Sequence, residues 1–222
     1  MNNKRINVLL FVVIALVALL PFQVFAGQIT GTVKVNGLRS PENILVYISK
    51  APSDPLDTSK ATFVMDQKNL TFIPHVLPIP EGVTVDFPNN DNVNHNVFSL
   101  SRTKKFNLGS YPRGESKKVT FDTAGIVELR CDVHAEMAAY ILVMKNPYFA
   151  ITDSKGHFTI PDVEYMKQHG ITGIKDLPAG KYVLKNWHEK LKTNSTEIEV
   201  PKDGKVSVQL DLSRGTPGVL YK

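Results

Sequence analysis

The sequence predicts an all-β protein that consists of two small β-sandwiches preceded by an N-terminal signal peptide. Short runs of alternating or continuously apolar residues recur along the 222-residue chain, and turn residues separate them. Only one short segment has the spacing of a helix. With 42% apolar and 21% charged residues, and with 14 Gly and 14 Pro, the composition excludes a disordered tail, a collagen and a coiled coil.

The first residues have the three parts of a secretory signal peptide. Met1 to Arg5 form a short basic stretch, Val8 to Leu20 are apolar without interruption, and Val24-Phe25-Ala26 ends in a small residue. The 13 apolar residues span about 20 Å as a helix, less than the roughly 30 Å of a hydrocarbon core. An uncleaved anchor that extends through Phe25 is the alternative. No cysteine follows the run, which excludes a lipoprotein anchor.

Cleavage after Ala26 implies a location outside the cytoplasmic membrane, in the periplasm or as a secreted protein, with no stable membrane span. The whole chain has 26 basic and 21 acidic residues and a net charge of +5. Without residues 1–26, which hold Lys4 and Arg5 and no acid, the net charge is +3. This charge is too small to indicate binding to nucleic acid.

The predicted strands are short, and turn residues bound each of them. The strands are expected at residues 30–35, 44–48, 83–87, 118–121, 126–130, 140–143, 182–184 and 206–210. Turn signals lie at Pro80-Glu81-Gly82, Thr123-Ala124-Gly125, Ser154-Lys155-Gly156 and Asp203-Gly204. The one plausible helix runs from Val163 to His169. Strands at this spacing indicate a sandwich or a barrel.

Cys131 is the single cysteine of the chain, which excludes an internal disulfide framework and a four-cysteine zinc site. In an exported protein an exposed free thiol is open to oxidation, so an odd cysteine needs a specific explanation. One explanation is a buried residue that acts as a small hydrophobic side chain. The residues around Cys131 favour a different one, a metal ligand.

The segment that begins at Cys131 has the spacing of a copper-binding loop. Cys131, His134 and Met137 follow one another at intervals of three residues, and His95 lies 36 residues upstream of the cysteine. Two His, one Cys and a weak axial Met are the ligands of a blue-copper electron-transfer site. We therefore expect one loop to present three ligands at the end of a sandwich. His95 would come from a neighbouring strand end, and the site would hold one type 1 copper ion.

Each of these residues also has an ordinary structural interpretation. Met137 alone would be typical core filler, His134 alone would be a hydrogen-bonded histidine, and His95 alone carries almost no information. Zinc is the competing metal, since Cys-His-His with water is a known set of zinc ligands, but zinc gains little from Met137. The joint occurrence with the only cysteine of an exported chain favours copper.

The segments that precede the ligands carry a family resemblance. They are Leu70 to Pro74, Pro80 to Phe87 with Asn89-Asn90, Gly114 to Phe121, and Gly125 to Cys131. Together with the ligand spacing, they make residues 61–146 resemble a cupredoxin of the plastocyanin, pseudoazurin and amicyanin kind, which is a Greek-key β-sandwich. The resemblance implies copper ligation by His95, Cys131, His134 and Met137. It also implies that Asn96 ties the two ligand loops together.

The resemblance further implies electron transfer. In cupredoxins the solvent-facing histidine edge is the electron port, which here would be His134. Partners would be redox proteins such as a c-type cytochrome, a dehydrogenase or an oxidase. The ligand loop departs from the family pattern because it lacks the usual proline and carries Asp132 and Glu136. Acids there could lower the reduction potential or present an acidic rim to a basic partner.

The flanking segments resemble a second family. The hairpin pattern Asp153-x-x-Gly156-x-Phe158 and the later Leu177-Pro178-x-Gly180-x-Tyr182 resemble the carboxypeptidase regulatory-like (prealbumin-like) β-sandwich. Its first strands are expected far upstream, at Gly31 to Val33 and Ile44 to Ile48. We therefore predict that a cupredoxin at 61–146 is inserted into a sandwich made of 27–60 and 147–222. A sequential layout of 27–146 and 147–222 is the alternative. Composite proteins of this kind are often labelled methylamine-utilisation-like, a label that implies no activity on amines.

Four further histidines lie outside the expected ligand set. His75 is an additional metal candidate because it precedes the first ligand strand, although a histidine without a metal role is the simpler interpretation. Trp187-His188-Glu189 invites a metal or catalytic interpretation, but we expect a strand-end aromatic residue with polar neighbours. We expect His157 and His169 to be exposed.

The sequence thus predicts an exported blue copper protein that carries single electrons and is not an enzyme. Alternatives are a copper-binding or copper-delivery module without redox turnover, a zinc-binding protein and a purely structural β-sandwich protein. An enzyme with Cys131 as its nucleophile is disfavoured, because the sequence has no nucleophile elbow and no oxyanion-hole motif.

Overall fold

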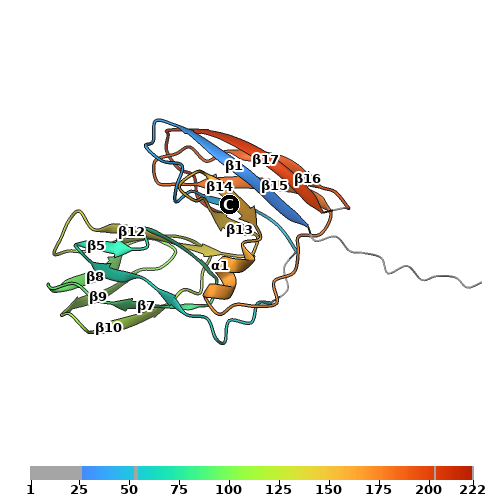
Figure 1. Cartoon of the computed structure of the whole chain (residues 1–222). Coiled ribbons are helices and arrows are strands. Elements are labelled where there is room, and N and C mark those ends of the chain that lie inside the picture. The colour runs from blue at the N-terminus through green and yellow to red at the C-terminus, as the bar shows by residue number, and fades with distance from the viewer. Residues whose placement is uncertain (1–26, 53–54, 203, 222) are drawn as a thin grey trace, which may run out of the picture.

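The computed structural model describes residues 27–52, 55–202 and 204–221, and the predicted signal peptide, residues 1–26, lies outside the described residues. The described part has 17 strands and the short helix α1 (Val163–Gln168), so the predicted all-β class is confirmed. Among the described residues, no helix is long and apolar enough to cross a membrane. Figure 1 shows the strands in two groups, one above the other, with α1 between them.

The first group, which we call the first sandwich, contains strands β3 to β12. Its five-stranded sheet has the order β6 (Val76–Pro80), β12 (Ala138–Met144), β11 (Gly125–Arg130), β8 (His95–Ser99) and β9 (Phe106–Tyr111). Its three-stranded sheet has the order β10 (Ser116–Thr120), β7 (Thr84–Pro88) and β3 (Phe63–Val64). A hairpin of β4 (Asp66–Lys68) and β5 (Thr71–Ile73) completes the group.

The second group, which we call the second sandwich, combines strands from both ends of the described chain. One sheet has the order β14 (His157–Ile160), β1 (Gln28–Asn36) and β17 (Lys205–Ser213). The other has the order β13 (Phe149–Ile151), β2 (Leu45–Ile48), β15 (Gly180–Trp187) and β16 (Ser195–Val200). The strands β1 and β17 are parallel neighbours from Gln28 and Lys205 to Asn36 and Ser213.

The chain leaves and re-enters the second sandwich at adjacent positions. β2 ends at Ile48, β13 begins at Phe149, and the two strands pair antiparallel. The Ile48 N–H donates to the Tyr148 carbonyl at 2.9 Å, so the two ends of the intervening segment are hydrogen-bonded to each other. A segment whose ends meet in this way is easily accommodated between two paired strands. The predicted boundaries 27–60, 61–146 and 147–222 stay a prediction.

β2 has four consecutive apolar residues because both of its faces are covered. Leu45 and Tyr47 belong to the hydrophobic cluster of the first sandwich, whereas Val46 and Ile48 belong to that of the second. All four are fully buried. Since successive side chains of a strand point to opposite faces, β2 lies between the two cores. The continuous run in the sequence is therefore the pattern of a strand buried on both sides.

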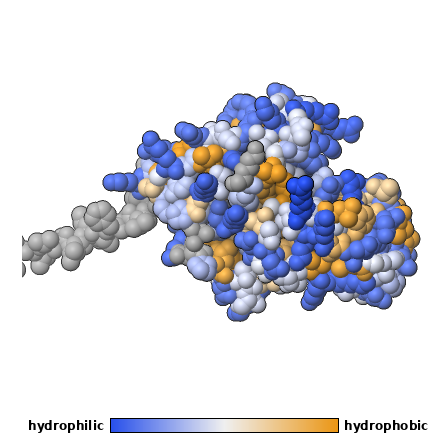
Figure 2. All heavy atoms as spheres, turned by 180° about the vertical axis from the view of Figure 1, so that it is seen from behind, coloured by the Kyte–Doolittle hydropathy of each residue, from blue (hydrophilic) through white to orange (hydrophobic). Residues whose placement is uncertain are grey.

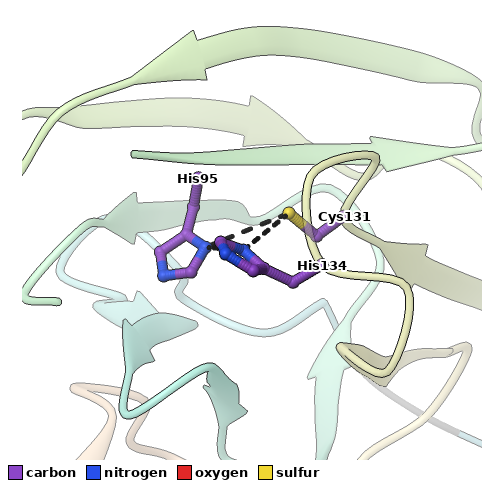
Figure 3. A group of neighbouring side chains, drawn as sticks. All are labelled: His95, Cys131 and His134. Carbon is purple, nitrogen blue, oxygen red and sulfur yellow. Dashed lines mark hydrogen bonds between the residues drawn. The ribbon is translucent and has the colours of Figure 1, made fainter. Parts of the chain in front are cut away.

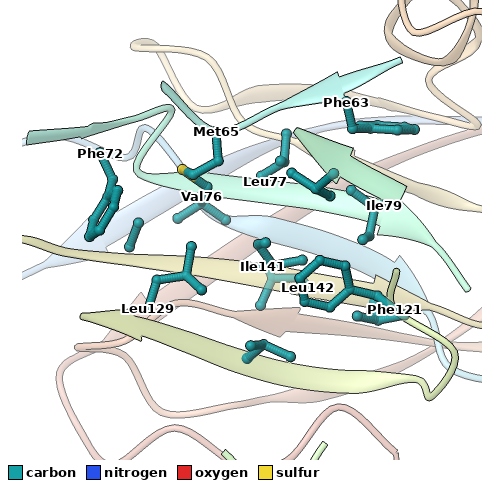
Figure 4. Close-up of a cluster of buried hydrophobic side chains, with 14 of the residues drawn as sticks. Phe63, Met65, Phe72, Val76, Leu77, Ile79, Phe121, Leu129, Ile141 and Leu142 are labelled. Atoms are coloured by element: carbon teal, nitrogen blue, oxygen red, sulfur yellow. The ribbon is translucent and has the colours of Figure 1, made fainter. Parts of the chain in front are cut away.

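The core of the first sandwich is filled from both of its sheets. Figure 4 shows Phe63 of β3, Leu77 of β6 and Ile141 of β12 among the buried side chains of this cluster. Ile141 and Leu142 are fully buried. Phe149 and Trp187 of the second sandwich belong to the same cluster. The two sandwiches therefore share one continuous apolar contact.

Each of the eight predicted strands overlaps a strand of the structure. The largest differences are extensions: the strand predicted at residues 182–184 is β15, which begins at Gly180 and ends at Trp187. Trp187 is thus a strand-end aromatic residue, as expected. The other nine strands of the described residues were not among the eight predicted, and three of them, β3, β4 and β5, have only two or three residues each. Runs this short carry no detectable periodicity, which is why the sequence pattern alone did not predict them.

The predicted exposure of His169 is wrong, whereas that of His157 is correct. His169 follows α1, whose N-terminus is capped by the Asp162 carboxylate accepting from the Tyr165 N–H at 2.9 Å. Its ring stacks on Phe63 with centroids 4.4 Å apart, and its Nδ1 lies 2.8 Å from the Tyr165 carbonyl. The helix end packs on β3, and this contact leaves His169 only partly exposed. The side chain of His157 is 57% exposed.

We predict that Leu142→Ala destabilises the protein by about 2–5 kcal/mol, because it leaves a cavity in the hydrophobic cluster that the two sandwiches share. The free energy of unfolding would be measured by urea denaturation. Leu100 makes a matched control, since it is 76% exposed. Leu100→Ala should change the free energy by less than about 0.5 kcal/mol. Equal effects of the two variants would contradict this packing.

Candidate metal centre

The loop from Cys131 to Met137 joins two antiparallel strands of the five-stranded sheet. β11 and β12 pair up to Arg130 and Ala138, so the loop closes between neighbouring strand ends. Within it, the Met137 N–H donates to the His134 carbonyl at 3.1 Å. His95 is the first residue of β8, which pairs with β11 through Phe98 and Arg130. Strand pairing therefore brings His95 to the same end of the sheet.

Three of the four predicted ligands converge at this end, as Figure 3 shows. The Nδ1 atoms of His95 and His134 are 3.0 Å apart. Cys131 Sγ lies 4.0 Å from Nδ1 of His95 and 4.0 Å from Nδ1 of His134. Among the described residues, these three form the one group of at least three His, Cys, Asp or Glu side chains whose donor atoms lie within 4.8 Å of one another.

The donor atoms have spacings that fit a single metal ion. Metal bonds in proteins are about 2.0–2.1 Å to imidazole nitrogen and about 2.3 Å to thiolate sulfur. Two such bonds bridge donor separations of about 3–4 Å, which is the range of the separations seen here. Two imidazole nitrogens that face each other at 3.0 Å need either a shared proton or a cation between them. The three residues therefore fit a metal ion with small adjustments.

Met137 lies at the other end of the same loop. It is 1% exposed, and it belongs to the same hydrophobic cluster as Cys131. Its burial agrees with both interpretations that the sequence left open, an axial ligand and a core side chain. Its assignment as a ligand stays a prediction.

The carboxylate of Asp91 orients the ring of His95. His95 is fully buried, and its Nε2 lies 2.9 Å from Asp91 Oδ2. The Leu70 N–H donates to the same oxygen at 2.7 Å, and together with the hydrogen bond from His95 it holds the pKa of Asp91 at about 2. An ionised carboxylate keeps the proton of His95 on Nε2, so Nδ1 presents its lone pair toward Cys131 and His134.

Local backbone structure places Asp91 and its partners. β4 and β5 are joined by the two residues Asn69 and Leu70, both with positive φ, 53° and 57°. This turn directs the Leu70 N–H at Asp91. Asn89 is fully buried and organises the next loop, because its Nδ2 donates to the Val93 and Tyr111 carbonyls and its Oδ1 accepts from the Asp91 N–H.

Asn96 connects the two ligand segments. With its amide nitrogen facing the ligand loop, Asn96 donates to Asp132 Oδ1 at 3.1 Å and accepts from the Gly109 N–H at 3.3 Å. Asn96 follows His95, and Asp132 follows Cys131. The contact thus links the residues next to two of the predicted ligands, as the family resemblance implied. Glu136, the other acid of the loop, is exposed.

Burial differs among the three converging side chains. His95 is 0% exposed and Cys131 is 5% exposed, whereas His134 is partly exposed. Val93 and Val133, which lie two and one residues before the two histidines, are 43% and 52% exposed. The route from solvent to the cluster therefore passes His134.

The remaining histidine candidates lie elsewhere. His75 Nε2 lies 3.3 Å from Glu189 Oε1, at the junction of the two sandwiches. His188 Nδ1 accepts from the Lys190 N–H at 3.0 Å, so the ring proton of neutral His188 is on Nε2. That nitrogen has no lone pair free for a metal. The structure places neither residue in the Cys131 cluster.

Asp91 is the residue of the centre that we did not predict from the sequence. The signal available was a carboxylate four residues before His95, in a segment rich in Asn. This signal is weak, because acids are common in such turns. The loop must fold before the carboxylate meets the ring.

We predict that Asp91→Asn lowers the affinity for a bound metal by about 10–100-fold, because the neutral amide no longer favours the Nε2 proton of His95. Affinity would be measured by competition with a chromophoric chelator. Asp122→Asn is the matched control, since Asp122 is 66% exposed and pairs with Lys104. The control should bind as the unaltered chain does. Unchanged affinity in Asp91→Asn would contradict the orienting role.

No family model matches the chain, and no curated protein matches its sequence. Several solved structures resemble part of it. A purple cupredoxin from Nitrosopumilus maritimus is 26% identical, with a TM-score of 0.33 over 38% of this chain and 99% of its own. An amicyanin from Paracoccus versutus is 21% identical, with a TM-score of 0.35 over 46% of this chain and 99% of its own.

A copper-containing nitrite reductase from Thermus scotoductus is 23% identical, with a TM-score of 0.36. The similarity covers 51% of this chain but only 28% of the reductase. These three likenesses cover between 38% and 51% of the chain.

Proposed function

We propose that the chain is an exported type 1 copper protein that carries single electrons between redox partners and is not itself an enzyme. The observation that carries the proposal is the convergence of Cys131 Sγ with Nδ1 of His95 and of His134 at one end of a β-sandwich. The thioether of Met137, buried on the same loop, completes the proposed ligand set. Two His, one Cys and a weak axial Met are the ligands of blue-copper centres.

The side chains of the centre suit a group that changes oxidation state without large rearrangement. A bound copper ion would supply the one-electron change between Cu(I) and Cu(II). The thiolate and thioether favour the reduced ion, and imidazole suits both. His95 is held by Asp91, and the ligand segments are linked through Asn96 and Asp132. The donors are therefore positioned before a metal binds.

Exposure supports His134 as the place where electrons enter and leave. His95 and Cys131 are buried, while His134 is partly exposed beside the exposed Val133. Figure 2 shows apolar side chains gathered at the end of the molecule away from the grey trace. Next to the two histidines, the exposed side chains of Val93 and Val133 give an apolar surface that suits brief contacts with protein partners. We propose a c-type cytochrome, a dehydrogenase or an oxidase as the class of partner.

The proposed location and domain arrangement follow from the sequence. We propose that the chain is exported to the periplasm or secreted, by means of the signal peptide at residues 1–26. We further propose that residues 61–146 are a cupredoxin inserted into a carboxypeptidase regulatory-like sandwich. The hydrogen bond between Ile48 and Tyr148, at the two ends of the intervening segment, supports the insertion.

The copper proposal predicts an intense visible absorption band from thiolate-to-copper charge transfer after loading of the mature chain with Cu(II). The band should be absent in Cys131→Ala, because the sulfur donor is missing. Visible and electron paramagnetic resonance spectra would measure both. A colourless protein that binds Cu(I) alone would indicate copper delivery without redox turnover, and binding of zinc in preference to copper would indicate a zinc site. Absence of copper binding would overturn the proposal.

The axial assignment predicts that Met137→Gln keeps copper bound and lowers its reduction potential. The amide oxygen is a harder donor than the thioether and stabilises Cu(II) relative to Cu(I). The potential would be measured by voltammetry of the loaded protein. Met137→Leu provides the comparison, since it keeps an apolar side chain of similar size without a donor, and it should raise the potential. Equal potentials in the three proteins would remove Met137 from the ligand set.

A further inference from the structure

The two sandwiches meet in a polar contact between His75 and Glu189. His75 directly precedes β6 of the first sandwich, and Glu189 follows β15 of the second by two residues. Nε2 of His75 lies 3.3 Å from Oε1 of Glu189. The side chains are 39% and 14% exposed, so the contact is partly shielded from water. It joins two segments that are 114 residues apart in the sequence.

The same histidine also contacts the strand that leaves the candidate metal loop. The backbone of Ala138, the residue directly after Met137, lies beside this ring and favours its charged form. The Tyr140 N–H donates to the His75 carbonyl at 2.9 Å, and the two rings meet edge to face with centroids 5.7 Å apart. His75 thus connects Glu189 of the second sandwich to the backbone next to Met137.

The contact has the character of an ion pair. The hydrogen bond to Glu189 raises the pKa of His75 above its ordinary value, although burial opposes this shift. Burial alone would raise the pKa of Glu189, but the hydrogen bond from His75 and nearby charges hold it at about 2. A raised pKa of the imidazole beside a lowered pKa of the carboxylate, at an Nε2–Oε1 distance of 3.3 Å, is the behaviour of an ion pair.

The other titratable groups around the pair come from both sandwiches. Lys190 Nζ lies 3.7 Å from Glu189 Oε1 and is 60% exposed. His188 Nε2 lies 3.4 Å from Glu189 Oε2, without the geometry of a hydrogen bond, and burial lowers the pKa of His188. From the first sandwich, Tyr140 packs against His75. His75 is therefore the imidazole of this cluster whose surroundings favour the charged form.

We propose that His75 and Glu189 are positioning residues for the metal centre: the second sandwich, through Glu189 and His75, fixes the backbone that follows Met137. The inference rests on the proposed function, in which Met137 is the axial ligand. In blue-copper sites the axial ligand is weak and long, and it tunes the reduction potential. A restraint on the residue after Met137 is therefore a restraint on the least tightly held ligand.

The first test uses the metal-free mature chain, followed by NMR of the His75 ring and the Met137 methyl group across pH. The Met137 signal should move as His75 titrates, because deprotonation removes the charge with which the ring faces Glu189 and the Ala138 backbone. In Glu189→Gln, the midpoints of both signals should shift to lower pH together. The polar contacts of Glu189 are with His75, His188 and Lys190 and not with His95 or His134, so a common shift of the two midpoints identifies His75 as the group responsible.

Asp153→Asn is the matched control, since Asp153 lies 3.4 Å from His157 in an exposed pair of the second sandwich. It should leave both midpoints unchanged. An unshifted His75 midpoint in Glu189→Gln would overturn the ion pair. If the His75 midpoint shifts in Glu189→Gln but the Met137 signal does not shift with it, the contact joins the two sandwiches without positioning Met137, and the positioning role is overturned.

The second test loads the chain with copper and measures the reduction potential across the same pH range. The potential should change as His75 titrates, and Glu189→Gln should move this change to lower pH. The ion pair also contributes to the free energy of unfolding. This contribution should be complete at pH values below the ordinary pKa of histidine, and it should be lost as pH rises through the raised pKa of His75. A reduction potential that stays constant while His75 titrates would contradict the inference. If no copper centre forms, the proposed function is refuted. The NMR experiment on the metal-free chain would then still show whether the titration of His75 affects Met137.

Discussion

The pairing of β8 with β11 is the constraint on which the candidate metal centre depends. The strands are antiparallel and meet at Phe98 and Arg130, so the start of one and the end of the other extend in the same direction. His95 and Cys131 therefore reach the same end of the sheet although 36 residues separate them. Once this register is set, the loop closed by β11 and β12 brings His134 to the same place. A slip by one residue would turn His95 to the opposite face.

The two sandwiches pack against each other, because strands of the second sandwich share buried surface with the first. β2 contributes alternate side chains to both hydrophobic clusters, and Trp187 of β15 packs against Tyr140 of β12 with ring centroids 5.1 Å apart. β12 is also the strand that follows the candidate metal loop. The position of this loop is therefore coupled to the packing between the sandwiches, and His75 and Glu189 add a polar contact at the same junction.

Much of the fold could be predicted because apolar runs bounded by turn residues are a local property. The strands that begin at Gln28, Thr84 and Gly125 were all expected close to their observed positions. The prediction failed where exposure depends on a distant segment: His169 is partly buried by Phe63, which lies more than a hundred residues earlier. The boundaries of the insertion stay a prediction, because they depend on which strands pair with each other and not on where each strand lies in the sequence.

The sequence by itself determined the chemistry of the candidate centre: one thiol, two imidazoles and a thioether, with three of them on one short loop. Spacing along the chain was sufficient for this, because residues three apart between two strands must share a loop. Only the tertiary structure decided that Asp91 holds the proton of His95 on Nε2 and that Glu189 meets His75. The first contact needs a folded turn and the hairpin beside it, and the second needs two sandwiches packed together. Side chains that meet across such distances are selected by strand register and core packing, which no local pattern of residues encodes.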